Sequence, residues 1–218
     1  MRRIIFAPSE FYHLYNRGTE KREIFSGLAD YKRFLLLLYI CNGTLPVDLK
    51  LQGSTLEELV ALERGETLVD ICAYCLMPNH FHLLIKEKEA GGASRMMQKL
   101  ITAYTMYFNK RYERTGSLFQ GRFKATHAAE DRYLSYLISY IHLNPIKLIE
   151  PVWKETGIKE REKAEEYLKN YSHSSFLDYA GESRVESCII NKEALPSYFE
   201  TPRDFQTSVF EWLGHKQG

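Results

Sequence analysis

The sequence predicts an α+β protein whose core is an antiparallel four-stranded sheet with helices packed on it. Two observations support this fold class. Hydrophobic residues make up 44% of the 218 residues and charged residues 26%, a composition typical of a globular protein. Stretches with strand-type and helix-type hydrophobic spacing also alternate along the chain up to the Asn144-Pro145 dipeptide.

The first strand and the first helix are each bounded by turn residues. Aromatic side chains typical of strands occupy residues 11–16 and end at the turn signal Arg17-Gly18. An apolar stretch that has Asp30 in its first turn ends before Asn42-Gly43. This pattern predicts a helix over residues 30–41.

The next segment predicts an insertion followed by a hairpin. Glycine and proline recur through residues 43–66, which are acidic and contain one short expected helix at 55–63. Residues 67–75 are β-branched and apolar, and Met77-Pro78-Asn79 separates them from a second strand at 80–86. Two strands joined by so short a turn are typical of a β-hairpin.

Three further elements complete the expected core. Residues 94–112 have apolar side chains at helical spacing and end before Thr115-Gly116. A strand is expected at 120–128. A last helix at 130–143 is stopped by Asn144-Pro145.

The resulting order is β-α-β-β-α-β with one added helix, which is the ferredoxin-like arrangement. We therefore expect one catalytic domain over residues 1–150, with 43–66 as an acidic insert. Residues 151–218 are polar and are expected to form a peripheral, mostly helical extension with one clear helix at 159–170.

The formal net charge of +1 hides a strong segregation of charge. Residues 1–33 carry 7 basic and 4 acidic side chains, and residues 95–147 carry 9 and 3. The insert region 42–70 and the tail 148–218 are acidic, with 2 basic against 6 acidic and 9 against 13. Clustered cations attract polyanions whatever the total charge, so a nucleic-acid partner stays compatible with this composition.

No segment predicts a membrane span or a secretory signal. The longest strongly apolar run, from Phe34 to Cys41, has eight residues and is too short to cross a bilayer. The N-terminus has no apolar stretch of signal length before Pro8. We therefore expect a cytoplasmic protein that does not contact a membrane.

The expected strand at 80–86 carries a candidate metal site. Side chains alternate across a strand, so His80 and His82 share one face, which we expect to be exposed. Phe81, Leu83 and Ile85 point to the other face and into the core. Two imidazoles on one face can bind one metal ion together, and an unliganded pair of surface histidines is the alternative.

The last expected helix presents polar groups on a single face. Tyr136, Tyr140 and Asn144 follow one another at steps of four residues, so they lie in a row. A tyrosine can act as a covalent nucleophile once it is activated, although tyrosines at this spacing are also common at the rim of a core. The buried stripe of this helix is expected to comprise Leu134, Leu137, Ile138 and Ile141.

Together these residues resemble the single-tyrosine HUH transposases, and most closely the REP-associated tyrosine transposases. The resemblance extends over most of residues 11–145 and is carried by four blocks in the same order. These blocks are Tyr12-His13-Leu14-Tyr15-Asn16-Arg17-Gly18, Leu76-Met77-Pro78-Asn79-His80-Phe81-His82-Leu83-Leu84, Phe119-Gln120-Gly121-Arg122-Phe123-Lys124 and Tyr140-Ile141-His142-Leu143-Asn144-Pro145.

The resemblance implies a metal-dependent enzyme that acts on single-stranded DNA. His80, His82 and Asn144 match the metal ligands, and the metal is Mg²⁺ or Mn²⁺. Tyr140 matches the nucleophile, with Tyr136 as second choice. The implied reaction cleaves a DNA strand at or near a hairpin and forms a 5′-phosphotyrosine intermediate with a free 3′-OH, which can then rejoin strands.

The resemblance also implies a DNA partner and candidate contact residues. Arg17, Arg122, Lys124, His13 and Asn16 lie in matching blocks and are expected to contact DNA. The insert and the tail lie outside the shared core, so the DNA sequence and the choice between monomer and homodimer stay open.

Two other functions are compatible with the sequence. The chain could be a non-catalytic protein of the same fold that binds DNA hairpins. It could also be a zinc-binding nucleic-acid module that uses Cys72, Cys75, His80 and His82, although we expect the two cysteines on opposite faces of a strand. A relaxase or replication initiator would use the same chemistry, but such proteins are usually longer.

Overall fold

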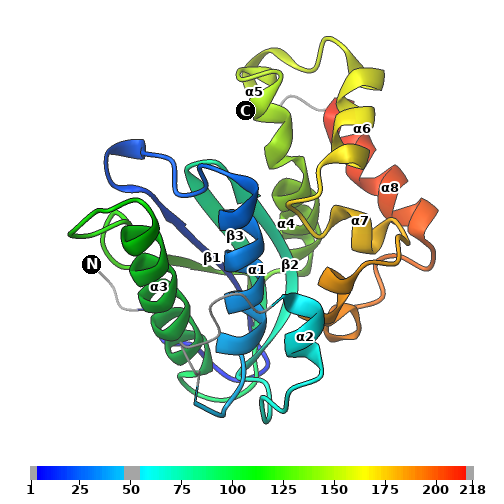
Figure 1. Cartoon of the computed structure of the whole chain (residues 1–218). Helices are drawn as coiled ribbons and strands as arrows, with labels where there is room; N and C mark the ends of the chain where they lie inside the picture. Colours follow the sequence, from blue (N-terminus) through cyan, green and yellow to red (C-terminus); the bar gives the residue numbers. More distant parts are fainter. Residues whose placement is uncertain (1–3, 47–54, 215–218) are drawn as a thin grey trace.

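A computed structural model of the chain describes residues 4–46 and 55–214 (Figure 1). Its centre is a four-stranded antiparallel sheet with strand order β2-β3-β1-β4. The strands are β1 (Phe11–Arg17), β2 (Val69–Met77), β3 (His80–Glu87) and β4 (Lys124–His127). The predicted α+β class and the β-α-β-β-α-β order are confirmed.

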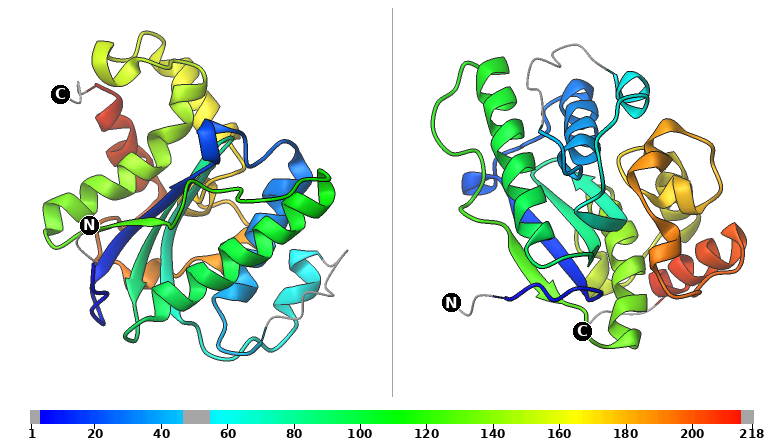
Figure 2. Two further views of the ribbon diagram at one scale, coloured as in Figure 1. Left: turned by 90° about the vertical axis from the view of Figure 1, so that its left-hand side faces the viewer. Right: turned by 90° about the horizontal axis from the view of Figure 1, so that it is seen from below.

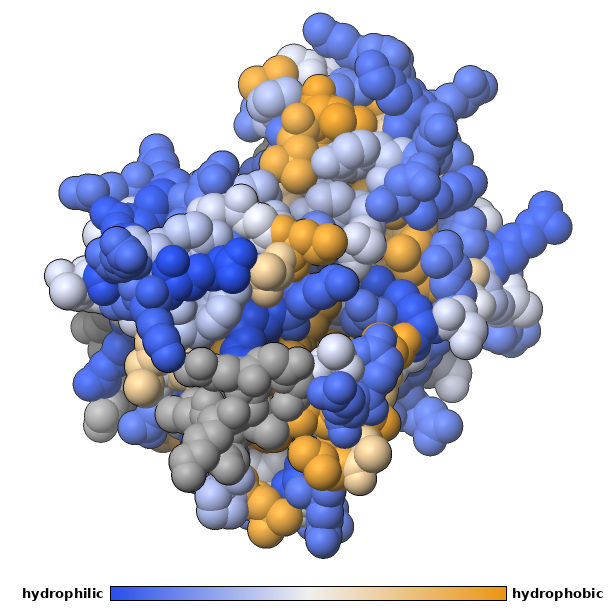
Figure 3. All heavy atoms as spheres, in the orientation of Figure 1, coloured by the Kyte–Doolittle hydropathy of each residue, from blue (hydrophilic) through white to orange (hydrophobic). Residues whose placement is uncertain are grey.

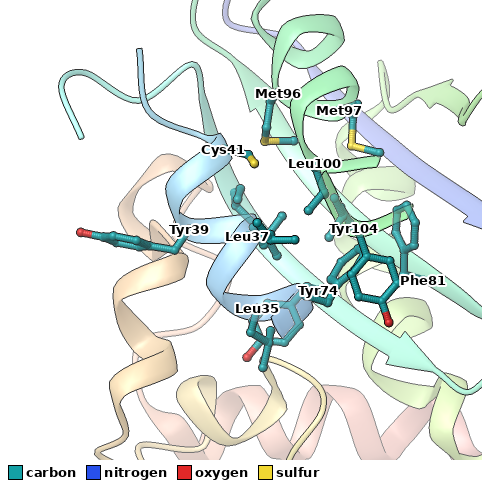
Figure 4. Close-up of a cluster of buried hydrophobic side chains, with 14 of the residues drawn as sticks. Leu35, Leu37, Tyr39, Cys41, Tyr74, Phe81, Met96, Met97, Leu100 and Tyr104 are labelled. Atoms are coloured by element: carbon teal, nitrogen blue, oxygen red, sulfur yellow. The ribbon is translucent and has the colours of Figure 1, made fainter. Parts of the chain in front are cut away.

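One face of the sheet is covered by α1 (Leu28–Cys41) and α3 (Gly92–Arg111), which lie side by side in Figures 1 and 2. Figure 4 shows Met96, Met97 and Leu100 of α3 above the sheet, together with Leu37 of α1. Phe81, Leu83 and Ile85 belong to this apolar core, as predicted. The short helix α2 (Leu56–Val60) adds Leu56 and Leu59 at its margin.

The expected insert is anchored at both of its ends. A β-bridge pairs Gly43 with Thr67, and α2 begins with a capping box between Thr55 and Glu58. Residues 47–54 of the insert lie outside the described residues. The helix expected over 55–63 is shorter because the chain leaves helical geometry after Val60.

The other face of the sheet is covered by α4 (Asp131–Leu143) and by the C-terminal extension. The extension contains α5 (Trp153–Thr156), α6 (Arg161–Asn170), α7 (Phe176–Tyr179) and α8 (Pro202–Glu211). The short 3₁₀ helices of the chain are η1 (Thr19–Lys21), η2 (Asn144–Leu148), η3 (Val185–Ile189), η4 (Lys192–Ala194) and η5 (Trp212–Gly214).

The extension is part of the hydrophobic core. Trp153, Phe176 and Phe205 are buried in the same cluster as Ile138 and Ile141 of α4. All four residues of the predicted α4 stripe are buried there as well. A boundary at residue 150 therefore does not separate two cores, and the extension does more than lie at the periphery.

The extension also covers the outer edge of β2. The Leu76 amide donates a hydrogen bond to the His173 carbonyl at 2.9 Å, and the Ser175 amide donates to the Tyr74 carbonyl at 3.0 Å. Nearby, the Arg184 guanidinium donates to the buried Asp178 carboxylate at 2.9 Å. These contacts fix the segment that follows α6 against the sheet.

A bulge in β2 changes the predicted orientation of two cysteines. The register between β2 and β3 shifts between Ile71 and Ala73, so Cys72 is an extra residue in the strand. Cys72 and Cys75 consequently both face α4 and are buried there. The expectation that they lie on opposite faces is wrong, because a one-residue bulge reverses the alternation.

The surface seen in Figure 3 is mainly hydrophilic, with separate smaller hydrophobic areas. Two of the exposed apolar side chains are Leu148, the last residue of η2, and Val152, which precedes α5. Among the described residues, no helix combines the length and the apolar character needed to span a membrane.

Candidate active site

The site forms on the α4 side of the sheet, where β1, β3 and α4 meet. His80 and His82 lie on β3 with ring centroids 4.9 Å apart and nearly perpendicular ring planes. They share one face as predicted, but that face is covered. His82 is only 6% exposed, and His80 is partly exposed. The expectation of an exposed strand face is therefore wrong, because α4 and the extension pack over it.

The turn before β3 orients the first histidine. Nδ1 of His80 lies 2.6 Å from Oδ1 of Asn79, and Nδ2 of Asn79 donates to the Lys21 carbonyl at 3.2 Å. The second bond assigns the amide oxygen to the histidine, so Nδ1 of His80 must carry the proton. Nε2 of His80 is then the nitrogen with a free lone pair.

The second histidine has a buried partner on the neighbouring strand. Nδ1 of His82 lies 2.8 Å from Nε2 of His13, and the two rings are stacked with centroids 5.0 Å apart. Burial lowers the pKa of His13 to about 4 and holds the pKa of His82 well below its usual value. Burial also lowers the pKa of His80 to about 4. All three imidazoles are thus neutral near pH 7, as metal ligation requires.

Helix α4 brings a phenol to these rings, and an amide follows directly after its last residue. The Tyr140 ring is nearly perpendicular to the rings of His82 and His13, with centroids 5.8 and 5.9 Å away. Asn144 lies one turn further along and is 1% exposed. Its Nδ2 donates to the Tyr140 carbonyl at 2.8 Å, so Oδ1 is the atom left for a ligand.

The extension contributes a cation that the sequence did not indicate. Nζ of Lys154 lies 3.9 Å from the centroid of the Tyr140 ring, which is cation–π geometry. Burial and the nearby Lys147 lower the pKa of Lys154 to about 8, so the ammonium is mostly charged at pH 7. Burial raises the pKa of Tyr140 above its ordinary value. A phenol in this position needs nearby positive charge to ionise.

Tyr136 lies on the same helix face but in different surroundings. Its ring is 5.8 Å from Tyr140 and packs edge-on against Trp212 at 4.9 Å. Burial, together with the neighbouring Tyr140 and Tyr133, raises its pKa. The ring contacts with His13 and His82 are made by Tyr140, which favours Tyr140 over Tyr136 as nucleophile.

The five candidate DNA contacts fall into two groups. Arg17, Arg122 and Lys124 are exposed, and Arg17 lies opposite His80 in the β1–β3 register. Asn16 is 4% exposed, and it donates from Nδ2 to the Gly121 carbonyl at 3.2 Å. His13 is 6% exposed and is hydrogen-bonded to His82. The buried pair supports the fold and the histidines, while the exposed three are free to meet a polyanion.

The donor set fits a divalent cation of intermediate softness. Two imidazole nitrogens and one amide oxygen suit Mn²⁺ and accept Mg²⁺ less well. Among the described residues, no three or more His, Cys, Asp or Glu side chains are grouped so that they could hold a metal. The candidate set differs from such a group because its third member is an amide.

The cysteines of the zinc alternative are in unfavourable surroundings for a metal. Burial raises the pKa of both Cys72 and Cys75 far above that of a free thiol. Sγ of Cys72 lies 3.7 Å from the Asp70 carbonyl, as in a weak thiol hydrogen bond. Metal ligation requires thiolates, so this environment favours inert core thiols.

Sequence reasoning missed the partners that orient these groups. Asn79 was noted as a turn residue, and Lys154 lies in a segment without a motif. Ser175 lies in the C-terminal extension, outside the core that carries the family resemblance. Its Oγ bonds to Nε2 of the buried His142 at 2.8 Å and accepts from the Tyr74 amide at 2.9 Å. It therefore joins α4 to β2 behind the site.

Two comparisons with known proteins show what the chain and its fold are similar to. The family model described as "Transposase IS200 like" matches residues 52–144. A solved structure of a REP-associated tyrosine transposase bound to a REP hairpin aligns with TM-score 0.53 and 12% identity, covering 85% of this chain and 89% of that chain. This likeness shows a shared fold.

Two further results carry no functional argument. The tRNA(His) guanylyltransferase from Saccharomyces cerevisiae aligns with TM-score 0.35 and 10% identity, over 91% of this chain and 86% of that chain. That score is too low to indicate a common fold. No curated protein matches the chain.

Proposed function

We propose that the chain is an IS200-like, single-tyrosine transposase that cuts and rejoins single-stranded DNA beside hairpins through a covalent bond to Tyr140. The family model over residues 52–144 and the shared fold support this proposal. The hairpin is suggested by the DNA bound to the structural neighbour. The cleavage and the covalent intermediate are our proposals from the site.

The placement of Tyr140 carries this proposal. Its ring lies over the buried His13–His82 pair, 5.8 Å from His82, and Asn144 follows it by one helical turn. A phosphate bound by His80, His82 and Asn144 through a metal would therefore lie within reach of the phenol oxygen. A tyrosine that only filled the rim of the core would not need two ligand-type groups beside it.

The proposed first step is an in-line displacement at phosphorus. The Tyr140 oxygen forms a bond to the scissile phosphorus, and the bond from phosphorus to the 3′ oxygen breaks. The phenolic proton is released to solvent, and the departing 3′ oxygen takes up a proton to become a 3′-OH. The reverse attack by a 3′-OH on the phosphotyrosine rejoins strands without any external energy source.

The surrounding charges favour this step. A bound Mn²⁺ or Mg²⁺ would neutralise the phosphate and polarise its phosphorus. The Lys154 ammonium lies over the face of the Tyr140 ring, 3.9 Å from its centroid. In this position it stabilises negative charge as it develops on the phenol oxygen. Positive charge would then act on the nucleophile from Lys154 of the extension and on the phosphate from a metal ion held at the sheet.

Exposed cations near the strand ends support a DNA partner. Arg17, Arg122 and Lys124 lie at the end of β1 and along the segment that leads into β4. The Gln120 amide donates to the Arg17 carbonyl at 2.8 Å, which keeps the two segments together. We propose that they contact the phosphate backbone and position the DNA.

The test compares two single substitutions, Tyr140→Phe and Tyr136→Phe. Purified protein with Mn²⁺ is mixed with single-stranded hairpin DNA taken from the flanks of its gene, and adducts are separated on a denaturing gel. We expect the covalent adduct in the wild type and in Tyr136→Phe and its loss in Tyr140→Phe. An adduct in Tyr140→Phe would refute the assignment of the nucleophile. Hairpin binding without any cleavage would support the non-catalytic alternative instead.

A further inference from the structure

The position of His13 fits neither a residue that contacts DNA nor a side chain that only packs in the core. It lies on β1, which is flanked by β3 and β4 in the sheet, and only 6% of the residue is exposed. Its Nε2 lies 2.8 Å from Nδ1 of His82. A buried polar atom of this kind requires a partner, and here that partner is a candidate metal ligand.

The bond between two neutral imidazoles permits two proton arrangements. In the first, Nδ1–H of His82 donates to Nε2 of His13, and Nε2 of His82 keeps a free lone pair. In the second, Nε2–H of His13 donates, and the proton of His82 then sits on its own Nε2. Only the first arrangement lets Nε2 of His82 bind a metal.

The other histidine of the pair shows the same pattern with a different partner. Oδ1 of Asn79 accepts the proton on Nδ1 of His80 at 2.6 Å, and Lys21 fixes the orientation of that amide. Both histidines therefore have Nδ1 occupied by a neighbour from outside β3. Both can present Nε2 to one site.

We propose that His13 is a positioning residue of the metal site, which accepts the Nδ1 proton of His82 and so presents Nε2 of His82 to the metal. This inference rests on the proposed roles of His80, His82 and Asn144 as ligands. It assigns His13 to the support of the metal in place of the DNA contact expected from the sequence.

The experiment measures binding of Mn²⁺ alone, without DNA, by the loss of the free-ion signal in electron paramagnetic resonance. His13→Phe keeps a ring but removes the acceptor, and we expect Mn²⁺ affinity to fall about 10–100-fold. His13→Gln returns an acceptor oxygen and should recover most of the affinity. His127→Gln is the matched control, because His127 also lies in the sheet but pairs with Glu10 at the surface.

The outcomes separate this inference from the function on which it rests. If His13→Phe bound Mn²⁺ as tightly as the wild type, the positioning role of His13 would be overturned. If it also bound the DNA hairpin more weakly, the result would instead support the DNA contact expected from the sequence. Wild-type Mn²⁺ affinity in His82→Asn would instead show that the metal site itself is misplaced.

A second measurement is independent of whether His13→Phe folds. Long-range ¹H–¹⁵N spectra of the ¹⁵N-histidine-labelled wild type with Mg²⁺ report the tautomer of each ring, and loss of a signal in His82→Asn assigns His82. We expect the proton of His82 on Nδ1. A proton on Nε2 of His82 would overturn the proposal.

Discussion

The two faces of the sheet each cover a hydrophobic core but differ in what else they bury. The face under α1 and α3 is mainly apolar and aromatic, as Phe34, Phe81 and Tyr104 illustrate. Its buried Asp30 accepts hydrogen bonds from the hydroxyls of Tyr107 and Tyr112. The face under α4 and the extension also buries His13, His82, Asn144 and Asp178. Buried polar groups are costly unless they are paired. The first face can thus supply stability, whereas the second face also holds the groups that we propose for the chemistry.

The first prediction concerns a substitution in the apolar core under α1 and α3. Phe34 is fully buried, with ring contacts to Phe25, Phe81 and Tyr104 at 5.0–5.2 Å. Phe34→Ala should lower the free energy of unfolding by about 3–5 kcal/mol, because it leaves a cavity. Urea unfolding measures this loss, with the exposed Met106→Ala as control. Adduct formation per folded molecule should not change. A selective loss of adduct would show that the two faces are not independent.

The second prediction concerns a substitution in the buried ion pair between Arg184 and Asp178 of the extension. Arg184 donates two hydrogen bonds to the Asp178 carboxylate, one at 2.9 Å, and another to the Tyr74 hydroxyl at 2.8 Å. Arg184→Met leaves the carboxylate buried without its cation and should cost about 3 kcal/mol of stability. Here we also expect slower adduct formation, since the extension that carries Lys154 is loosened. An unchanged unfolding midpoint, with exposed Lys163→Met as reference, would contradict the prediction.

The third prediction separates charge from packing at Tyr140. Lys154→Met keeps an unbranched side chain over the ring but removes the ammonium. We expect the single-turnover rate of adduct formation to fall roughly tenfold, while the Kd for hairpin DNA changes little. Lys154→Arg should recover most of the rate because guanidinium also binds ring faces. A parallel loss in rate and in DNA affinity would instead assign Lys154 to substrate binding.

The last and smallest effect lies where the two faces meet, at the edge of β2. His173 of the extension stacks on Tyr31 of α1 with ring centroids 3.7 Å apart. Burial, with Arg184 nearby, lowers the pKa of His173 to about 4, below its unfolded value of about 6.5.

Between these two pKa values the unfolded chain binds a proton that the folded chain does not, so stability falls as pH drops from 6.5 to 4. Urea unfolding at several pH values should show a shallower decline in His173→Gln, since the other buried histidines still titrate. An equally steep decline in the variant would exclude His173 from this acid sensitivity.

Much of the first face and the outline of the site were predictable from the sequence. The helices and strands were set by local periodicity. Spacing placed His80 with His82 and Tyr140 with Asn144 on shared faces, while their proposed roles came from the family resemblance. The expected first residue of the strand 120–128 was less accurate than its last. Pairing begins only at Lys124 because a turn with Gly121 at φ +74° precedes it.

The second face was much harder to predict, for identifiable physical reasons. No glycine or proline in the strand signals the bulge at Cys72. The prediction based on alternating faces was therefore wrong at this point. His82 was expected on an exposed face and His13 was expected to contact DNA. Both are buried instead, because their cover comes from distant residues. The contact of Lys154 with Tyr140 depends on how α5 packs, which no local pattern encodes.

The segment from His173 to Ser175 has a consequence for self-association. An unpaired strand edge is a template on which other chains can add a strand and aggregate. Here the outer edge of β2 is occupied by its own chain. The opposite edge is β4, which has four residues and carries an exposed lysine, Lys124. The described sheet therefore offers little open edge, and the extension occupies an edge on which another chain could otherwise add a strand.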